Sequence, residues 1–500
     1  MAALTAALTA EALGSGVAAA MVALTVEPMV ALTVEPMAAL TVKPMAALTV
    51  EPMAAPMAAL TVEPMAAQMV EPMAAPMAAQ MVEPMAEPMA AQMVEQMAAP
   101  FAEDSVLARL SAVDRDRFAD QHWGQQPLLS PAADLPGGFP ELLNADAIDE
   151  LVSQRGLRTP FIRVAKSGST LSDKAFTAPG GVGAGIADQV SDDKLVRLFS
   201  EGSTLVLQAL HRTWPPILEF CQRLAAELGH PVQANAYVTP PQNQGFSAHY
   251  DVHDVFVLQI EGEKQWRVHP PVLESPLRDQ PWSDRQAAVE KRAQEPPLLE
   301  ALLRPGDCLY LPRGYLHAAT ALGGVSTHLT LGVHVWTRLV LAERVVDQAV
   351  RRLAGDPVMR ASLPLGVDVA DPSGMRHDVE LITAALVAAV ERADLDQLAD
   401  SMLQDARRSQ RAAPIGPLRQ LRDAEALTDD SALVLRDHLV ASVDHTRSGI
   451  VVRSRAGDVT VTESDVAPLK ALLNNGTASA ADLGLDLARR LLLAGLVIVE

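Results

Sequence analysis

Residues 234–271 read ANAYVTPPQNQGFSAHYDVHDVFVLQIEGEKQWRVHPP and carry the pattern that decides the fold. Short apolar runs rich in valine, leucine and tyrosine alternate with turn-forming residues, and the pattern continues through residues 307–335. The groups EGE at 261–263, PRG at 312–314 and GG at 323–324 interrupt these runs and predict turns. Such a succession of short strands predicts a β-barrel or a folded β-sandwich, with helices preceding it.

Within this stretch, the hexapeptide HYDVHD at residues 249–254 concentrates side chains that bind metals. Read as the start of a strand, it places His249, Asp251 and His253 on one face and Asp254 on the other. Neighbours on one face lie about 6.6 Å apart, so His249 and Asp251 can share an ion, whereas His253 lies about 13 Å from His249. The segment therefore offers two ligands, and the third has to come from another part of the chain.

Four downstream histidines are candidates for the third ligand: His269, His317, His328 and His334. His317 follows a predicted strand and a PRG turn, an arrangement that brings an imidazole back to the rim of a barrel. Two histidines and one carboxylate on β-strands make the facial triad of non-haem iron oxygenases, which leaves open positions on the metal. A His-x-Asp pair is common, and isolated histidines are usually structural, so this spacing alone is weak support.

The chain on either side of this region has a different composition. Residues 1–100 repeat units such as VALTVEPM, contain no aromatic residue and carry regular prolines, which predicts a disordered low-complexity segment. Residues 105–118 and 214–229 have helical spacing, and residues 198–210 predict a buried strand after a turn. Beyond residue 340, long amphipathic helices are expected.

The C-terminal residues predict a further small unit. Residues 449–462 have the pattern of a hairpin, and they precede a helix that ends at Gly476 and then a final helix and strand. This order is typical of a winged-helix unit. Residues 441–500 hold seven acidic and six basic side chains, so direct DNA binding is disfavoured and a packing or partner-binding role is expected.

Composition narrows the class of protein further. The net charge of −21 argues against broad binding to nucleic acid or anionic membranes and suits a basic partner. The two cysteines, Cys221 and Cys308, support neither a disulfide framework nor a cysteine zinc site. No apolar run of about 18 residues predicts a membrane span, and the N-terminus lacks the basic region of a signal peptide. We therefore expect a cytoplasmic protein.

Residues 234–271, with RPGDCLYLPRGYLHAAT at 304–320 and STHLTL at 326–331, closely resemble the JmjC-domain ribosomal oxygenases. These proteins are a cupin-like branch of the Fe(II)/2-oxoglutarate hydroxylases. The resemblance implies an α+β protein with a double-stranded β-helix (jelly-roll) core. The resemblance covers residues 101–340 well and the remainder more loosely. Together with the patterns above it predicts four segments: a disordered repeat at 1–100, a JmjC catalytic domain at 101–340, a helical dimerisation segment at 341–430 and a winged-helix-like domain at 431–500.

The resemblance implies roles for individual residues. His249, Asp251 and His317 match the iron ligands. Lys264, which the EGE turn places in a hairpin, matches the basic residue that holds the distal carboxylate of 2-oxoglutarate; without the resemblance it would be interpreted as a solvated lysine. Polar positions lining the same pocket match three further residues: Asn235, Tyr237 and Thr330.

Several neighbouring residues are expected to have other roles. Gly332 stands where some relatives have a serine, so one pocket hydrogen bond is missing or made by water. His328 is expected to be a structural strand residue. Trp123 and Trp266 are expected in the core rather than as platforms for substrate.

The function implied by the resemblance is that of a dioxygenase. It would use Fe(II), 2-oxoglutarate and O2 to hydroxylate a His or Arg side chain of a ribosomal protein, and an acidic enzyme suits such a basic substrate. A homodimer is expected, because the helical segment has unpaired apolar faces. Three alternatives stay open: a JmjC-type demethylase, a cupin metalloenzyme that does not use 2-oxoglutarate, and a dimeric binding scaffold without activity.

Overall fold

The computed structural model describes residues 105–500 apart from 167, 184, 244–245, 369 and 447–448. The predicted disordered repeat at 1–100 lies outside the described residues. None of the described helices is both long and apolar enough to cross a bilayer.

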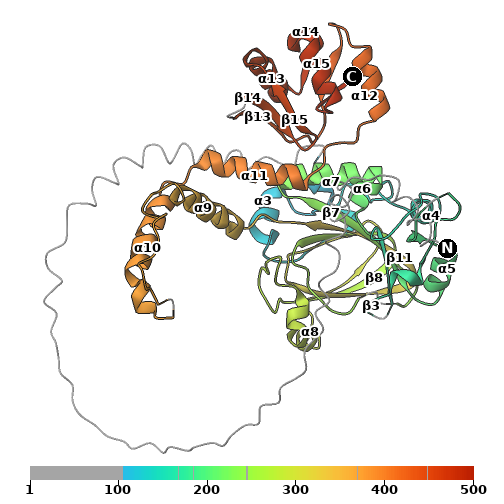
Figure 1. Ribbon diagram of the computed structural model, residues 1–500. Coiled ribbons are helices and arrows are strands. Elements are labelled where there is room, and N and C mark those ends of the chain that lie inside the picture. Colours follow the sequence, from blue (N-terminus) through green and yellow to red (C-terminus); the bar gives the residue numbers. More distant parts are fainter. Residues whose placement is uncertain (1–104, 167, 184, 244–245, 369, 447–448) are drawn as a thin grey trace, which may run out of the picture. The chain divides into compact units, whose positions relative to one another are not determined.

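A nine-stranded antiparallel sheet, folded over on itself, forms the centre of the part of the chain that runs from β1 to β11 (Figure 1). Its order is β1-β10-β8-β11-β7-β6-β2-β3, and β9 pairs with β8 off this path. The bounds are β1 Leu128–Ser130, β2 Ile162–Lys166, β3 Ser169–Thr170, β6 Thr204–Leu207, β7 Val232–Thr239, β8 Asp254–His269, β9 Leu299–Leu303, β10 Cys308–Leu311 and β11 Leu316–Val333. The predicted antiparallel β-core with helices in front of it is confirmed.

Two long strands, β8 and β11, replace the shorter strands that the sequence predicts. The EGE and GG groups are not turns: β8 passes through Gly262 and β11 through Gly323 without ending. Both glycines have positive φ, +65° and +69°, so the strands bend from one layer of the sheet to the other while their pairing continues on both sides. Lys264 is therefore a residue of a central strand and not of a hairpin, which corrects the prediction.

A β-bulge at this bend changes which residues of β8 face the interior. Gln259 pairs with His328 and Glu261 pairs with Thr327, so β8 has one extra residue opposite two consecutive residues of β11. Before the bulge, Val255 and Val257 line the interior; after it, the even-numbered residues of β8 do so. The bulge is what turns Lys264 toward the interior.

Gly262 supplies a direct test of this bend. Its Gly262→Ala variant is expected to lose about 3 kcal/mol of unfolding free energy, because the new Cβ would overlap the carbonyl oxygen of Val325 in addition to the cost of positive φ. Gly323→Ala is the matched control: it has a similar φ but no atom within 4 Å of the new Cβ, so only about 1 kcal/mol should be lost. Denaturant unfolding of both variants measures the difference, and equal losses would contradict the steric argument.

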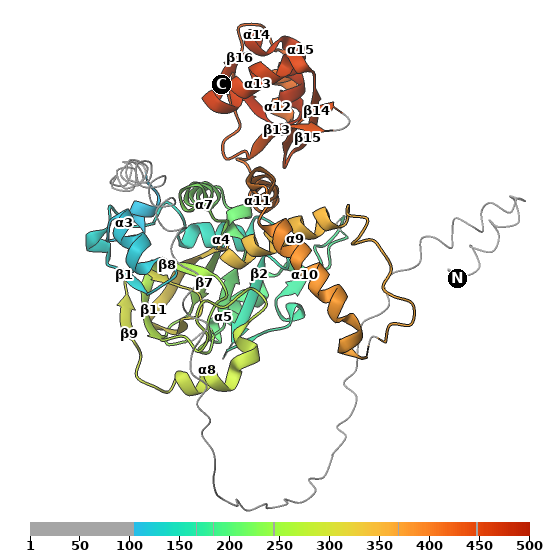
Figure 2. The ribbon, with the colours of Figure 1, turned by 90° about the vertical axis from the view of Figure 1, so that its left-hand side faces the viewer.

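Helices cover the sheet and close its main core. Helix α7 (Pro215–Leu228) begins with its two prolines in the first turn, ends at Gly229 and packs on β7 (Figures 1 and 2). Its buried face, including Ile217 and Leu224, joins an aliphatic and aromatic core with residues of the sheet. The predicted helix at 105–118 is wrong as a single element. The chain there forms a 3-10 turn, η1 Leu107–Arg109, and then a continuous helical segment made of α3 Arg115–Arg117 and the π-helix η2 Phe118–His122.

The C-terminal third is helical and then mixed. It contains α9 Arg338–Leu353, α10 Arg376–Val390, α11 Leu395–Ser409, α12 Pro417–Glu425, β12 Ala432–Leu435, β13 Ala441–Thr446, β14 Gly449–Ser454, β15 Gly457–Val461, α13 Glu463–Asn475, β16 Thr477–Ser479, α14 Ala480–Leu483, α15 Leu485–Leu493 and β17 Val497–Val499. The expected hairpin, helices and final strand are present, and a separate apolar core holds them together from Ala424 onward. We propose that this unit begins before the predicted boundary at 431, because Gln420 of α12 donates hydrogen bonds to the carbonyls of Leu492 and Val497.

Candidate metal centre and its pocket

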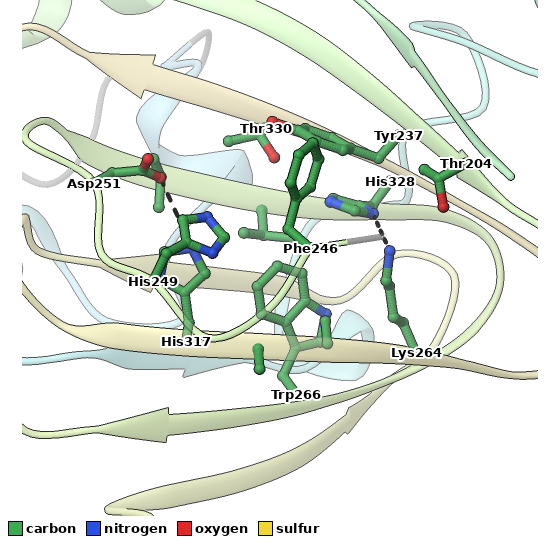
Figure 3. A pocket seen from close by; sticks show the side chains of 14 residues that line it. Thr204, Tyr237, Phe246, His249, Asp251, Lys264, Trp266, His317, His328 and Thr330 are labelled. Carbon is green, nitrogen blue, oxygen red and sulfur yellow. Dashed lines mark hydrogen bonds and ion pairs between the residues drawn. The ribbon is translucent and has the colours of Figure 1, made fainter. Parts of the chain in front are cut away.

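Three side chains from two distant segments meet at one end of the folded sheet (Figure 3). His249 and Asp251 belong to a loop before β8, and His317 is the second residue of β11. His249 and His317 exchange backbone hydrogen bonds of 3.2 and 2.8 Å, which hold the loop against the strand. One ligand atom from each side chain lies within 4.8 Å of the others, and His317 Nε2 is 3.8 Å from Asp251 Oδ2. This spacing suits one shared divalent cation.

Hydrogen bonds to the backbone orient both imidazoles. The Nδ1 of His249 lies 2.8 Å from the Ser247 carbonyl oxygen, and the Nδ1 of His317 lies 3.1 Å from that of Tyr315. A carbonyl only accepts, so each Nδ1 carries the proton and each Nε2 keeps a free lone pair for a metal.

The protonation states of the cluster also suit a metal. Burial, and after it the neighbouring His249, lowers the pKa of His317 to about 4. Burial raises the pKa of Asp251, but the three histidines around it outweigh that effect, so its pKa lies below the ordinary value. At neutral pH both groups are therefore deprotonated, as metal ligands must be.

His253 lies outside this cluster. Its ring packs against His334, with the centroids 5.2 Å apart, and its Nε2 lies 3.4 Å from the amide of Gln233. The strand expected at HYDVHD is wrong in detail, because β8 begins only at Asp254 and the preceding residues form a loop. The exclusion of His253 therefore agrees with the structure although the extended geometry behind it does not.

Lys264 lines the same pocket as the three clustered side chains and is almost completely buried, with 3% of its surface exposed. Its Nζ lies 3.2 Å from Thr239 Oγ1 and 3.3 Å from His328 Nδ1 (Figure 3). No carboxylate among the described residues forms an ion pair with it, and burial lowers its pKa to about 7. A buried amine without a counter-ion that faces a cavity is suited to an anionic ligand, whose charge would offset the cost of burying the ammonium.

The other predicted pocket residues differ in their placement. Tyr237 and Thr330 line the pocket, and Tyr237 stacks on His328 with the ring centroids 4.8 Å apart and nearly parallel. Asn235 is not among the lining residues: its side-chain oxygen accepts a 3.0 Å hydrogen bond from the backbone N–H of Ala209. The Asn235 side chain therefore binds the backbone just after β6 and does not line the pocket.

Several lining residues were not predicted as part of the pocket. His328 and Trp266 are buried core residues, as expected, but both also line the cavity. Their rings meet edge to face, 5.4 Å apart, and Trp266 also lies beside His317. Strand alternation could have found His328, because it lies two residues before Thr330 on one face of β11. No sequence signal pointed to two of the other lining residues, Thr204 and Phe246.

Comparison with known proteins gives consistent matches to one group. A family model described as JmjC domain matches residues 211–341. A Drosophila persimilis protein named bifunctional lysine-specific demethylase and histidyl-hydroxylase NO66 is 29% identical over 271 residues, which cover 52% of this chain and 36% of that protein. Human ribosomal oxygenase 1 is 35% identical over 188 residues, which cover 36% of this chain and 28% of that protein. The chain thus spans about a third of the length of these curated relatives.

Solved structures are similar to a longer part of the chain. The crystal structure of Escherichia coli ribosomal oxygenase YcfD aligns with a TM-score of 0.46 and 17% identity, over 78% of this chain and 99% of that one. A structure of YcfD in complex with cobalt and 2-oxoglutarate aligns with a TM-score of 0.45 and 18% identity, over the same shares of the two chains.

Proposed function

We propose that this chain, whose residues 211–341 match the family model described as JmjC domain, is an Fe(II)- and 2-oxoglutarate-dependent dioxygenase that hydroxylates a protein side chain. One observation carries the proposal: a two-histidine, one-carboxylate cluster and a buried lysine without a counter-ion line the same pocket. The first is a ligand set for Fe(II), and the second is a partner for a dicarboxylate.

The residues fit both groups. His249, Asp251 and His317 would hold the metal on one side and leave its other positions open to the pocket. Lys264 would bind the far carboxylate of 2-oxoglutarate, with Thr239 and His328 holding the amine in place. When bound, the metal and 2-oxoglutarate together supply the oxidation chemistry that activates O2.

The protein's own contribution is orientation and exclusion of water. The stacked rings of Tyr237 and His328, with Trp266 against His328, wall the space between the metal ligands and Lys264. Apolar side chains of β8, Val255 and Val257, close another side of this space. A small cavity walled in this way keeps an oxidising reaction away from bulk water.

The substrate that we propose is a basic ribosomal protein modified on a His or Arg side chain. The matched relatives are named ribosomal oxygenase and histidyl-hydroxylase, and the net charge of −21 would attract a basic partner. The name of the Drosophila relatives also includes lysine-specific demethylase. Removal of a methyl group is therefore the second candidate activity.

The test is incubation of the purified protein with Fe(II), 2-oxoglutarate and separated ribosomal proteins, followed by measurement of succinate and of intact and digested protein masses. Gain of one oxygen atom on a His or Arg peptide, with matching succinate, is the expected result. Loss of methyl groups from lysine would support the demethylase instead. Binding of neither metal nor 2-oxoglutarate would overturn both activities.

The affinity for 2-oxoglutarate should depend on pH through Lys264. Its pKa of about 7 means that the ammonium form, which the dicarboxylate requires, is lost as pH rises. Affinity should be nearly constant below pH 6 and fall roughly fiftyfold between pH 7 and 9, as titration calorimetry with Mn²⁺ in place of Fe(II) would show. Lys264→Arg keeps its charge over this range, so any affinity it retains should vary little; a wild-type affinity that does not change with pH would contradict the prediction.

His328 is expected to position Lys264. In His328→Phe a ring still packs on Tyr237, but the Nδ1 acceptor for the amine is lost, so 2-oxoglutarate should bind about tenfold more weakly. The affinity for Mn²⁺ should not change, because His328 is not one of the clustered ligands. Calorimetry of each ligand separates the two effects, and His328→Asn, which restores an acceptor, should recover part of the loss.

Two further parts of the proposal concern assembly and location. We propose that the chain forms a homodimer through its helical segment, because α9 and α10 expose large apolar side chains such as Val350 and Val379. Light scattering of the wild type and of a Val350→Glu/Val379→Glu variant tests this assembly. We also propose a cytoplasmic location and no direct DNA binding, on the basis of the net charge of −21 and the absence of an apolar run long enough for a membrane span.

A further inference from the structure

A second hollow, of about 220 Å³, lies between helices α4 (Ala145–Ser153) and α5 (Asp192–Ser200), which are labelled in Figure 2. We call it the α4–α5 groove. Its floor includes Leu205 of β6 and Val238 of β7. Leu205 follows Thr204, which lines the pocket of the candidate metal centre, and Val238 precedes Thr239, which contacts Lys264 in that pocket. Successive side chains of a strand point to opposite faces, so the groove lies on the outer face of the sheet, behind the Lys264 end of the pocket.

The lining of the groove is mainly apolar, and part of it is exposed. Leu205 and Val238 form a nearly buried floor, while Val196 on the wall has 71% of its surface exposed. Val325 also lines the groove, at the bend of β11 where the pairing with β8 is interrupted. Apolar surface gathered in one hollow, rather than scattered singly, is typical of a binding site.

The charged residues of the groove all have one sign. Asp149, Asp192 and Glu261 line it and are exposed. None of the three forms an ion pair with a described residue, and no described lysine, arginine or histidine is among the lining residues. The three carboxylates therefore present unbalanced negative charge around an apolar floor.

We propose that the α4–α5 groove binds a basic polypeptide segment that inserts one large apolar side chain between the two helices. Lysine or arginine residues on either side of that side chain would face Asp149, Asp192 and Glu261. The volume suits a single side chain better than a drug-sized ligand, for which about 300 Å³ or more is usual. The chain's own residues 1–100 are a poor match, since their charged residues are glutamates apart from Lys43.

This site is separate from the proposed reaction, and its test needs no turnover. If the substrate is a basic protein, the groove would contact it away from the modified side chain, and contacts of this kind add affinity without changing the chemical step. Binding at the groove can therefore be supported or overturned whether or not the chain is a hydroxylase.

The experiment measures fluorescence anisotropy of a labelled peptide, Lys-Arg-Lys-Leu-Arg-Lys-Arg, with the full chain. A second peptide has serine in place of leucine. The leucine peptide should bind at least about tenfold more tightly, because the groove would remove the apolar leucine side chain from water. Equal affinity of the two peptides would show attraction by net charge alone and would overturn the proposal.

Two matched pairs of variants locate the binding. Val196→Arg should remove the preference for leucine, whereas Val182→Arg, at a fully exposed valine outside the groove lining, should keep it. Replacing the three groove carboxylates with their amides should weaken the binding of both peptides. The loss should be about tenfold larger than the loss caused by the same change at three exposed carboxylates elsewhere, Glu274, Asp284 and Glu290.

Two other results would overturn the proposal. A leucine preference that survives in Val196→Arg, with an unchanged melting temperature, would place the peptide elsewhere. A change of molar mass in Val196→Arg by light scattering would show that a second copy of this chain, and not a basic segment, fills the groove.

Discussion

Replacing Asp251 or His317 with alanine should abolish turnover and reduce the affinity for Mn²⁺ by at least about a thousandfold. Each residue would supply one of the three ligand atoms proposed among the described residues, which lie within 4.8 Å of one another. Loss of a residue that merely supports a ligand typically costs about 10–100-fold, so loss of a ligand itself should exceed that range. Calorimetry with Mn²⁺, and succinate formation with Fe(II), measure the two effects independently.

His253→Ala is the matched control for these variants. It removes an imidazole from the same short loop, but that ring packs on His334 and is not part of the cluster. It should bind Mn²⁺ within about threefold of the wild type, a change of less than 1 kcal/mol. If His253→Ala lost the metal while Asp251→Ala kept it, the ligand assignment would be wrong.

Lys264→Met should abolish measurable 2-oxoglutarate binding and at the same time stabilise the fold. The ammonium is the only described cation lining the pocket apart from histidines, and loss of its charged hydrogen bonds to a carboxylate should weaken binding about a hundredfold or more. The metal affinity should stay unchanged. A Lys264→Met variant that bound 2-oxoglutarate as tightly as the wild type would show that Lys264 does not hold it. A wild-type chain that did not bind 2-oxoglutarate would favour the cupin enzyme that does not use it as co-substrate, or a scaffold.

The stabilisation follows from the direction of the lysine's pKa shift. Burial lowers the pKa of Lys264 from 10.5 to about 7, so the unfolded chain binds a proton that the folded chain does not hold between these values. Stability is therefore lost as pH falls from about 10.5 to 7, and methionine avoids that cost. The gain should be on the order of 4 kcal/mol at pH 7 and should disappear near pH 11.

Denaturant unfolding at pH 7 and at pH 10.5 tests this trade between stability and function. The control is Lys291→Met, at an exposed lysine of helix α8 (Gln286–Arg292), which should change little at either pH. A Lys264→Met variant that is less stable than the wild type at pH 7 would show that the amine is satisfied in the folded protein, contrary to the argument from its missing counter-ion.

The kind of fold and the chemistry of the site could both be predicted from local patterns. Apolar runs separated by turn residues predicted the antiparallel core, and the paired prolines and Gly229 marked helix α7 within a residue of its ends. Strand spacing in HYDVHD predicted two metal ligands in that segment, although residues 249–253 form a loop. The resemblance to JmjC proteins then pointed to His317 and Lys264, and the family match confirms the resemblance itself.

Other expectations failed for a common reason. EGE and GG looked like turns, since glycine is usually a sign of chain reversal, but in β8 and β11 the glycines bend continuous strands. Asn235 shares a strand with Tyr237, yet its side-chain oxygen accepts a hydrogen bond from the backbone N–H of Ala209 and does not reach the pocket. In each case a partner far away in sequence decides the outcome, and no local pattern contains that partner.

By itself, the sequence determined which side chains are available for the site. Only the tertiary structure decided that Lys264 lines the same pocket as the His249, Asp251 and His317 side chains. Simple alternation from Val255 would put Lys264 on the same face as Phe256 and Leu258, in the outer core. One extra residue at the bulge near Gly262 reverses that alternation, because side chains in a strand repeat every two residues and a shift of one exchanges the two faces.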